Sequence, residues 1–312
     1  MKTLFIYPLL GGAAITGIAL IIVNLIRLII YGIKKEISEN RSRKKDDEEW
    51  ALLERNGIDT SKMKNQVLGF SLRNEIVKGL QHNIDVRLYA DVKFECRQME
   101  QIRLGLENNV DARLYAYPEY DYEQMKQIRL GLENGVNVKL YADPRYDYYD
   151  MMQIRLGLEK GVDLMEYVEA KYEGGQLEEI RLGLEKGLDV SKYLDHKYDR
   201  FQMAEIREGI ERGIDVSRYA ISSFDYCQMK QIRLGIERGL DVSQYANPNF
   251  HSRNMTLIRW GLEHGHDMRQ YAFANYDDDQ WHEIYDGINH DRDISRACDP
   301  SMSWREMRRN IK

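Results

Sequence analysis

Apolar residues recur along most of this chain with helical spacing, inside a larger repeat of 26 residues. Between residues 120 and 144, Met125, Ile128 and Leu132 form one stripe at i, i+3 and i+7, which predicts an amphipathic helix of about thirteen residues. The hexapeptide Ile-Arg-Leu-Gly-Leu-Glu stands in this helix and is repeated unchanged four times. These copies begin at Ile102, Ile128, Ile154 and Ile180, and related copies begin at Ile76, Ile206, Ile232, Ile258 and Ile284.

Each predicted helix has a recognisable beginning and end. Asp121 is suited to cap the free backbone amides of the first turn, and Gln124 three residues later completes a capping box. Gly135 predicts the left-handed residue that follows a helix C-terminus. Asn137 then predicts the cap of a second, shorter helix. One unit therefore reads as helix, tight turn, short helix and loop.

A unit of this length cannot bury a core alone, so each copy must pack on its neighbours. With no alternating strand pattern in the chain, we predict an all-α fold, an α-solenoid of about nine repeats preceded by one transmembrane helix. The predicted segments are a short amino-terminal tail (1–3), a transmembrane helix (4–33), a charged linker (34–49), an amino-terminal cap (50–65), the solenoid repeats (66–300) and a carboxy-terminal cap (301–312).

The layout resembles tetratricopeptide and related helix-turn-helix repeats, although the period is shorter and the tryptophan, glycine and proline signature of those repeats is missing. The motifs Gln-Met, Ile-Arg-Leu-Gly-Leu-Glu, Gly-Leu-Asp-Val-Ser and Tyr-Ala at these offsets resemble short repeats in uncharacterised proteins of Firmicutes bacteria. This resemblance covers about four-fifths of the chain. It implies a bacterial repeat protein and no particular activity.

Residues 4–33 form a long apolar run that only Asn24 and Arg27 interrupt, and its length exceeds the roughly 20 residues that a bilayer core requires. A cleaved signal peptide is the alternative, because Lys2 precedes the run and residues 11–14 are small. The run continues beyond the usual signal core of about 7 to 15 residues, which favours a membrane span. More basic residues follow the run than precede it, so we predict a single-pass protein with a cytoplasmic solenoid. The basic residues after the run are Lys34, Lys35, Arg41, Arg43, Lys44 and Lys45.

Charge and motifs exclude several classes of function. The net charge is −6, and since residues 1–49 carry +2, the remainder carries −8. An acidic rod is poorly suited to nucleic acid, so we expect no nucleic-acid partner. We find no glycine-rich phosphate loop, nucleophile elbow, catalytic pair or metal-ligand spacing. We therefore expect no enzymatic activity, no cofactor and no metal.

Two columns of the repeat carry polar side chains that are candidates for binding or for packing. Arg129, Arg155 and Arg181 belong to a column of arginines that either offers guanidinium groups to an acidic or phosphorylated partner or pairs with the glutamate four residues on. A tyrosine column that includes Tyr141 and Tyr193 is expected in the core, with each hydroxyl at the rim.

The scaffold leaves some positions free to vary, and there aromatic and charged residues are mixed. The aromatic ones are Tyr122, Tyr148, Tyr149, Phe201 and Tyr226. Because residues that a scaffold does not need are where a solenoid usually recognises its partner, we predict that this surface binds a protein. One alternative is a structural membrane protein whose copies associate as a homo-oligomer, and another is a surface-anchored adhesin with the opposite topology.

Overall fold

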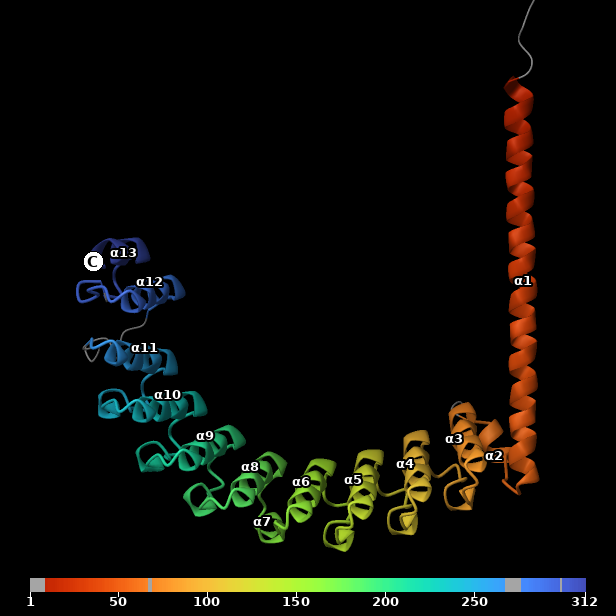
Figure 1. Cartoon of the computed structure of the whole chain (residues 1–312), viewed down its shortest axis with the longest axis horizontal. Helices are drawn as coiled ribbons and strands as arrows, with labels where there is room; N and C mark the ends of the chain where they lie inside the picture. Colours follow the sequence, from red (N-terminus) through yellow and green to blue (C-terminus); the bar gives the residue numbers. More distant parts are fainter. Residues whose placement is uncertain (1–8, 67–68, 267–275, 298) are drawn as a thin grey trace, which may run out of the picture. The chain divides into compact units, whose positions relative to one another are not determined.

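The structure is a computed structural model that describes residues 9–66, 69–266, 276–297 and 299–312, with side chains from residue 27 onward. Within these residues it contains thirteen α-helices, six short 3-10 helices and no strand. The chain forms two compact units, Met1–Arg129 and Leu130–Lys312. Inside each unit the helices pack on one another in series (Figure 1). The predicted all-α, solenoid-like fold is confirmed.

The first unit begins with a long helix that packs against the first repeat. Both α1 and α2 contact α3, and α3 contacts α4. Its elements are α1 (Leu9–Arg55), α2 (Ser61–Lys64), α3 (Gly69–Gln81), η1 (Val86–Leu88), α4 (Cys96–Glu107), η2 (Ala112–Leu114) and the beginning of α5 (Tyr122–Glu133).

Arg73 joins α1 to α3. Its side chain is 1% exposed, and its guanidinium lies 2.8 Å from Asp46 Oδ1 and 2.9 Å from Glu49 Oε2. The guanidinium also lies 4.0 Å from the Phe70 ring centroid and 5.1 Å from that of Trp50. The end of α1 therefore closes the first layer through a buried cation that carboxylates and aromatic rings surround.

The predicted membrane span falls mostly on residues about whose side chains nothing is described. Residues 4–8 lie outside the described part of the chain, and residues 9–26 are described only as helical backbone within α1. In the part that is described, the structure has no helix with both the length and the apolar character that crossing a bilayer demands. The span over residues 4–33 therefore stays a prediction from the sequence.

The second unit is itself built from a series of helical layers. Its successive layers are formed by α6, α8, α9, α10, α11, α12 and α13. Each of these helices except the last packs on the next one in this order. Its α-helices are α6 (Tyr148–Glu159), α7 (Met165–Glu169), α8 (Gly174–Glu185), α9 (Arg200–Glu211), α10 (Tyr226–Glu237), α11 (Ser252–Glu263), α12 (Asp278–Asn289) and α13 (Trp304–Asn310). The 3-10 helices are η3 (Val138–Leu140), η4 (Val190–Lys192), η5 (Val216–Arg218) and η6 (Val242–Gln244).

The predicted helix boundaries are confirmed. In α9, the Gln202 amide donates to Asp199 Oδ1 at 2.9 Å, and the Asp199 amide donates to Gln202 Oε1 at 2.8 Å. Gly213, just past the end of α9, has a φ of +71°. The predicted second helix is mostly a single 3-10 turn, because only three residues lie between a cap such as Asp215 and the buried Tyr219. In one of the 26-residue repeats, the α-helix α7 takes the place of this 3-10 turn.

The glutamine of several capping boxes also joins neighbouring layers. Gln202 Nε2 donates to the carbonyl of Phe224 at 2.6 Å and to that of Ser222 at 3.4 Å, both in the next repeat. One side chain therefore caps its own helix and satisfies backbone acceptors of the following layer. The same link to the next layer is made by Gln98, Gln176, Gln228 and Gln280.

The tyrosine column lies deeper than the sequence indicated. Tyr193 is fully buried, and its hydroxyl donates to the carbonyl of Glu179 at 3.2 Å. The expected position of the hydroxyl at the rim is wrong, because the tyrosine lies across the preceding helix at Gly183, which has no side chain. Burial raises the pKa of this phenol.

Candidate partner-binding surface

The exposed aromatic residues of the second unit lie at the amino-terminal ends of its helices. Tyr148 and Tyr226 occupy the first position of α6 and α10, and Tyr149 and Phe201 the second position of α6 and α9. Tyr148, Phe201 and Tyr226 are 45, 51 and 43% exposed, and Tyr149 is half-buried. The capping residues hold the backbone at these ends, and between them Tyr148, Phe201 and Tyr226 expose their rings to solvent.

Direct contacts connect these residues across four helices. The Tyr149 hydroxyl donates to Glu178 Oε2 at 2.7 Å, and Glu178 lies 3.8 Å from the Arg200 guanidinium. That guanidinium lies 5.0 Å from the Phe201 ring centroid, and the Phe201 and Tyr226 centroids are 5.2 Å apart. We call the surface formed by Tyr148, Tyr149, Glu178, Arg200, Phe201 and Tyr226 the aromatic strip.

Two glycines allow the strip to be continuous at α8. A β-carbon on Gly174 would lie 2.3 Å from Cδ1 of Tyr149, and one on Gly175 would lie 2.8 Å from Cδ of Arg200. Any side chain at these two positions would displace the residues that cross the beginning of α8. The strip therefore depends on the two glycines as well as on the aromatic residues.

Tyr122 belongs to the first unit and is described there by itself. It is the first residue of α5 and is half-buried. The Arg97 guanidinium lies 4.8 Å from its ring centroid. This pairing of an arginine with an aromatic ring repeats the chemistry of Arg200 and Phe201.

The arginine column runs through the interior of the layers. Arg129, Arg155 and Arg181 are only 9, 8 and 9% exposed. Arg129 Nε donates to Gln101 Oε1 at 3.1 Å, and Arg181 Nε donates to Gln153 Oε1 at 2.9 Å. Arg155 and Arg181 also pair with the glutamate four residues on. Of the two interpretations, the ion pair agrees with this geometry, and we leave these three arginines out of the proposed surface because little of each guanidinium is exposed.

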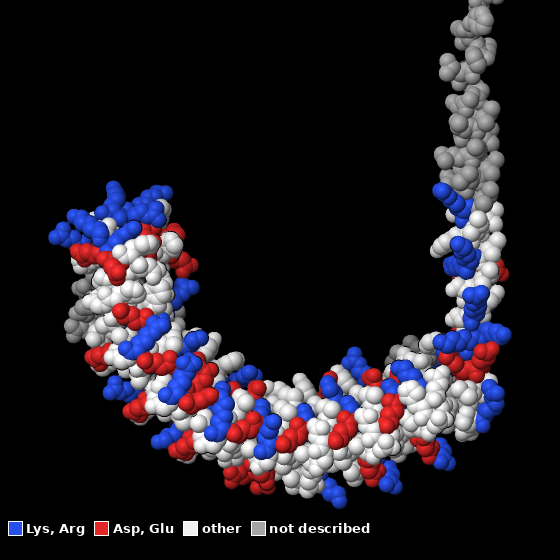
Figure 2. Space-filling view, viewed as in Figure 1, with Lys and Arg blue, Asp and Glu red and all other residues white. Residues whose placement is uncertain are grey.

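Charged residues outside the strip pair with one another across the layers. Basic and acidic side chains lie next to one another over α8 to α10 (Figure 2). Lys186 lies 2.5 Å from Glu211 in the next layer, and Arg212 lies 3.3 Å from Glu237 in the layer after it. These exposed pairs contribute little stability, and they lie at the carboxy-terminal ends of the helices, whereas the aromatic strip lies at the amino-terminal ends.

In the repeat that contains α7, Asp150 stands at the position where other repeats have the glutamine of the capping box. Asp150 lines a pocket of about 440 Å³ together with Arg145, Lys171 and Tyr172. Its Oδ1 atom is buried and has no hydrogen-bond partner among the residues that the structure describes. Burial, with the nearby charges of Asp147 and Glu173, raises the pKa of Asp150 to about 6. A carboxylate cannot donate to backbone carbonyls as the glutamine amide does, so this joint between layers lacks the usual link.

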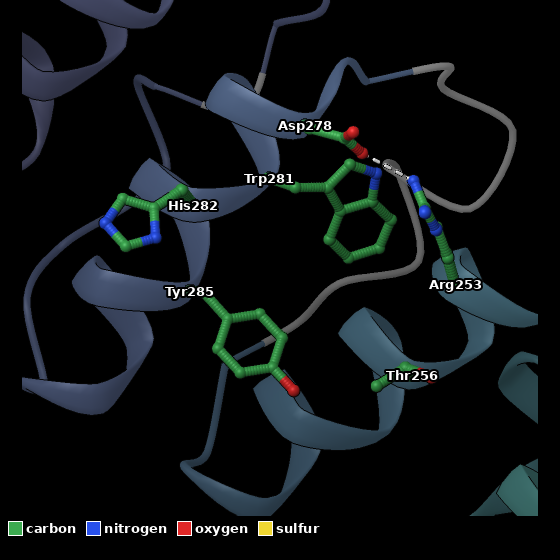
Figure 3. Close-up of a pocket in the computed structure, with 6 residues that line it drawn as sticks. All are labelled: Arg253, Thr256, Asp278, Trp281, His282 and Tyr285. Atoms are coloured by element: carbon green, nitrogen blue, oxygen red, sulfur yellow. Dashed lines mark hydrogen bonds and ion pairs between the residues drawn. The ribbon is translucent and has the colours of Figure 1, made fainter. Parts of the chain in front are cut away.

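The structure contains a pocket that the sequence did not predict. It has a volume of about 320 Å³ and lies between α11 and α12 in the second unit (Figure 3). The residues that line it are Arg253, Thr256, Asp278, Trp281, His282 and Tyr285. Two breaks in the repeat pattern are the signals that could have indicated it, since Trp281 stands in the methionine column and Tyr285 in the arginine column.

Comparison with known proteins identifies no relative. No protein-family model matches this chain, and neither a curated protein nor a solved structure is similar to it. The fold class therefore rests on the helical packing alone, and the resemblance to named repeat families is unconfirmed.

Proposed function

We propose that this chain is a scaffold or adaptor that binds a protein partner through the aromatic strip. The observation that carries the proposal is the contact between Phe201 and Tyr226, two half-exposed rings that hold each other at 5.2 Å on the solvent side of adjacent layers. Exposed aromatic residues in contact are costly in water and are enriched at protein interfaces. The proposal assigns the chain no catalytic role and no cofactor.

A second part of the proposal concerns location. Residues 4–33 would anchor the chain in a bilayer, and the basic residues that follow would keep the repeats in the cytoplasm. A scaffold of this kind would hold its partner close to the membrane. The support for this part comes from the length and composition of the apolar run.

Co-purification from the native cell tests the binding surface. Full-length chain with Tyr148→Ala, Tyr149→Ala and Tyr226→Ala should lose the proteins that accompany the unaltered chain. A control with Leu140→Ala and Ile221→Ala removes two other exposed apolar side chains, 38 and 46% exposed, and should retain them. Retention of every partner by the triple variant would contradict the proposal.

Thiol labelling tests the topology. Burial raises the pKa of the Cys96 thiol, which slows its reaction, so an exposed reporter is needed. Ile221→Cys places a thiol at a position that is 46% exposed. A membrane-impermeant maleimide should label this variant only after the cells are permeabilised. Labelling on intact cells at the same rate would exclude the cytoplasmic arrangement.

A further inference from the structure

The layer formed by α11 and α12 departs from the repeat at three columns together. In the preceding layers of this unit, the fourth residue of the helix is a fully buried methionine or leucine, such as Met255. The eighth is an arginine such as Arg259, whose Nε donates at 2.9 Å to Gln231 of the layer before. In α12 these two positions are Trp281 and Tyr285, and the position that should hold the acceptor is Leu257.

The three replacements change the chemistry of the layer in a coordinated way. With Tyr285 in place of the arginine, no cation requires a buried acceptor, and Leu257 leaves none unsatisfied. The Tyr285 ring packs instead on Trp260, with centroids 4.1 Å apart. The polar link that joins other layers is therefore replaced here by a contact between aromatic rings.

The rings of Trp281 and Tyr285 form one side of the pocket between α11 and α12 (Figure 3). Trp281 and Tyr285 lie one turn apart on α12, and Thr256 faces them from α11. At the mouth, Arg253 Nη1 lies 2.6 Å from Asp278 Oδ1, and these two side chains are 62 and 85% exposed. The pocket thus has an aromatic interior and a charged, solvent-facing rim.

We propose that this pocket receives one aromatic side chain from a partner protein, in a segment where basic residues flank it. This inference rests on the proposed function, because it gives the scaffold a second point of contact within the unit that carries the aromatic strip. A volume of about 320 Å³ is at the lower end of ligand pockets and suits a single large side chain better than a cofactor. A ring entering it would stack against Trp281 and Tyr285.

The acidic residues of α12 are the reason for expecting basic residues on either side of the partner's aromatic ring. The first turn of α12 carries Asp277, Asp278 and Asp279, and Asp286 lies two turns further on. Arg253 pairs with Asp278 in a solvent-exposed contact that costs little to open, and Arg292 lies 3.2 Å from Asp286, which leaves Asp277 and Asp279 without an arginine in these pairs. Lysine or arginine next to the inserted ring would complement the remaining carboxylates.

The test uses labelled peptides and the full-length chain. Fluorescence anisotropy would measure binding of fluorescein-labelled Lys-Lys-Phe-Lys-Lys, of its alanine analogue, and of an analogue with glutamate flanks. We expect the phenylalanine peptide to bind about tenfold more tightly than either analogue. Equal affinity of the phenylalanine and alanine peptides would overturn the inference.

The repeat itself supplies the matched variant. Leu257→Gln, Trp281→Met and Tyr285→Arg together restore the residues that other layers carry, so this variant should fold while it loses the pocket. It should bind the phenylalanine peptide about tenfold more weakly than the unaltered chain, and unchanged affinity would contradict the inference. Circular dichroism would verify folding. If this variant unfolds, Thr256→Phe fills the pocket from α11 instead and should weaken binding by the same factor.

Failure of this inference is distinguishable from failure of the proposed function. The strip variant with alanine at Tyr148, Tyr149 and Tyr226 should bind the phenylalanine peptide normally, because those residues do not line the pocket. If the strip variant loses the natural partner while no peptide binds the pocket, the scaffold function stands and the pocket inference falls. If the peptide binds and the strip variant keeps every partner, the strip is excluded and the pocket remains.

Discussion

The hydroxyl of Tyr219 occupies the space that a side chain on Gly209 would need. Its Oη atom lies 1.8 Å from the place of a β-carbon on Gly209, and it donates to the carbonyl of Glu205 at 3.1 Å. The glycine of the repeated hexapeptide and the tyrosine ten residues later therefore form one structural element. The same approach is found for Gly79 and Tyr89, Gly105 and Tyr115, Gly131 and Tyr141, Gly183 and Tyr193, and Gly235 and Tyr245.

Gly209→Ala should therefore destabilise its layer even though alanine favours helix. We expect a loss of about 1 to 3 kcal/mol in the free energy of unfolding from overpacking, measured as a lower urea midpoint by circular dichroism. Tyr219→Phe added to this variant should recover part of the loss, because the clashing hydroxyl is gone. The comparison is Gly157→Ala, where no tyrosine hydroxyl is near and the closest atom is the backbone carbonyl oxygen of Val162 at 2.9 Å, so Tyr219→Phe should recover none of its loss. Failure of Tyr219→Phe to recover any of the loss at Gly209→Ala would contradict this account.

Within the arginine column, we expect removal of Arg233 to cause the largest loss of stability. It contacts Glu205, Glu208 and Glu237 at 2.8, 2.9 and 2.6 Å while its own side chain is 4% exposed. Arg233→Met leaves Glu205, whose side chain is 12% exposed, without its arginine, while Glu237 keeps Arg212 at 3.3 Å. The substitution should cost about 3 kcal/mol near neutral pH. For comparison, Arg145→Met removes an arginine that is 85% exposed and should cost less than about 1 kcal/mol.

The loss of stability caused by Arg233→Met should depend on pH. Burial already raises the pKa of Glu205, and removing the arginine raises it further. A carboxyl whose pKa is higher in the folded chain stabilises the fold when protonated and loses that contribution as pH rises through the folded pKa. Urea midpoints of Arg233→Met should therefore approach those of the unaltered chain at pH 5 and diverge at pH 8. A pH-independent difference would exclude Glu205 as the cause.

Asp150→Gln should stabilise the second unit at alkaline pH. The pKa of Asp150 is about 6 in the fold against an ordinary value of 3.8, so its favourable contribution is complete only below about pH 4 and is lost as pH rises through 6. Glutamine carries no such charge, and it offers the amide donor that other layers use. We expect a gain of about 1 to 2 kcal/mol at pH 8 that shrinks towards pH 5. Asp143→Asn should have the opposite sign, because Arg145 lowers the pKa of Asp143 to about 2.

Gln202→Glu tests the link between layers. The substitution places a carboxylate against the carbonyls of Ser222 and Phe224, which lose their donor. We expect a loss of about 2 to 3 kcal/mol at pH 7, with recovery under acid conditions where the glutamate regains a proton to donate. Hydrogen exchange of the α9 and α10 amides would show whether the damage is local. The exposed Gln66 provides the control, and Gln66→Glu should change neither measurement.

Features within one repeat were predictable because their signals are local. Asp199 and Gln202 are three residues apart, and their reciprocal hydrogen bonds need only a helical turn to bring them together. Gly213 ends α9 because glycine readily adopts the positive φ that follows a helix C-terminus. The exposure of Phe201 and Tyr226 follows from their places between capping residues, so these members of the candidate surface were found as well.

Features between repeats required the tertiary structure. The sequence by itself determined the helical repeat, its caps and which positions vary, since each depends on neighbours within a turn or two. It left open whether Arg181 faces a partner or the interior, and only stacking decided this, by placing Gln153, 28 residues earlier, within 2.9 Å of its Nε. The same holds for the pocket beside Trp281 and Tyr285. Contacts between layers depend on how helices pack in three dimensions, and no spacing along the chain specifies that arrangement.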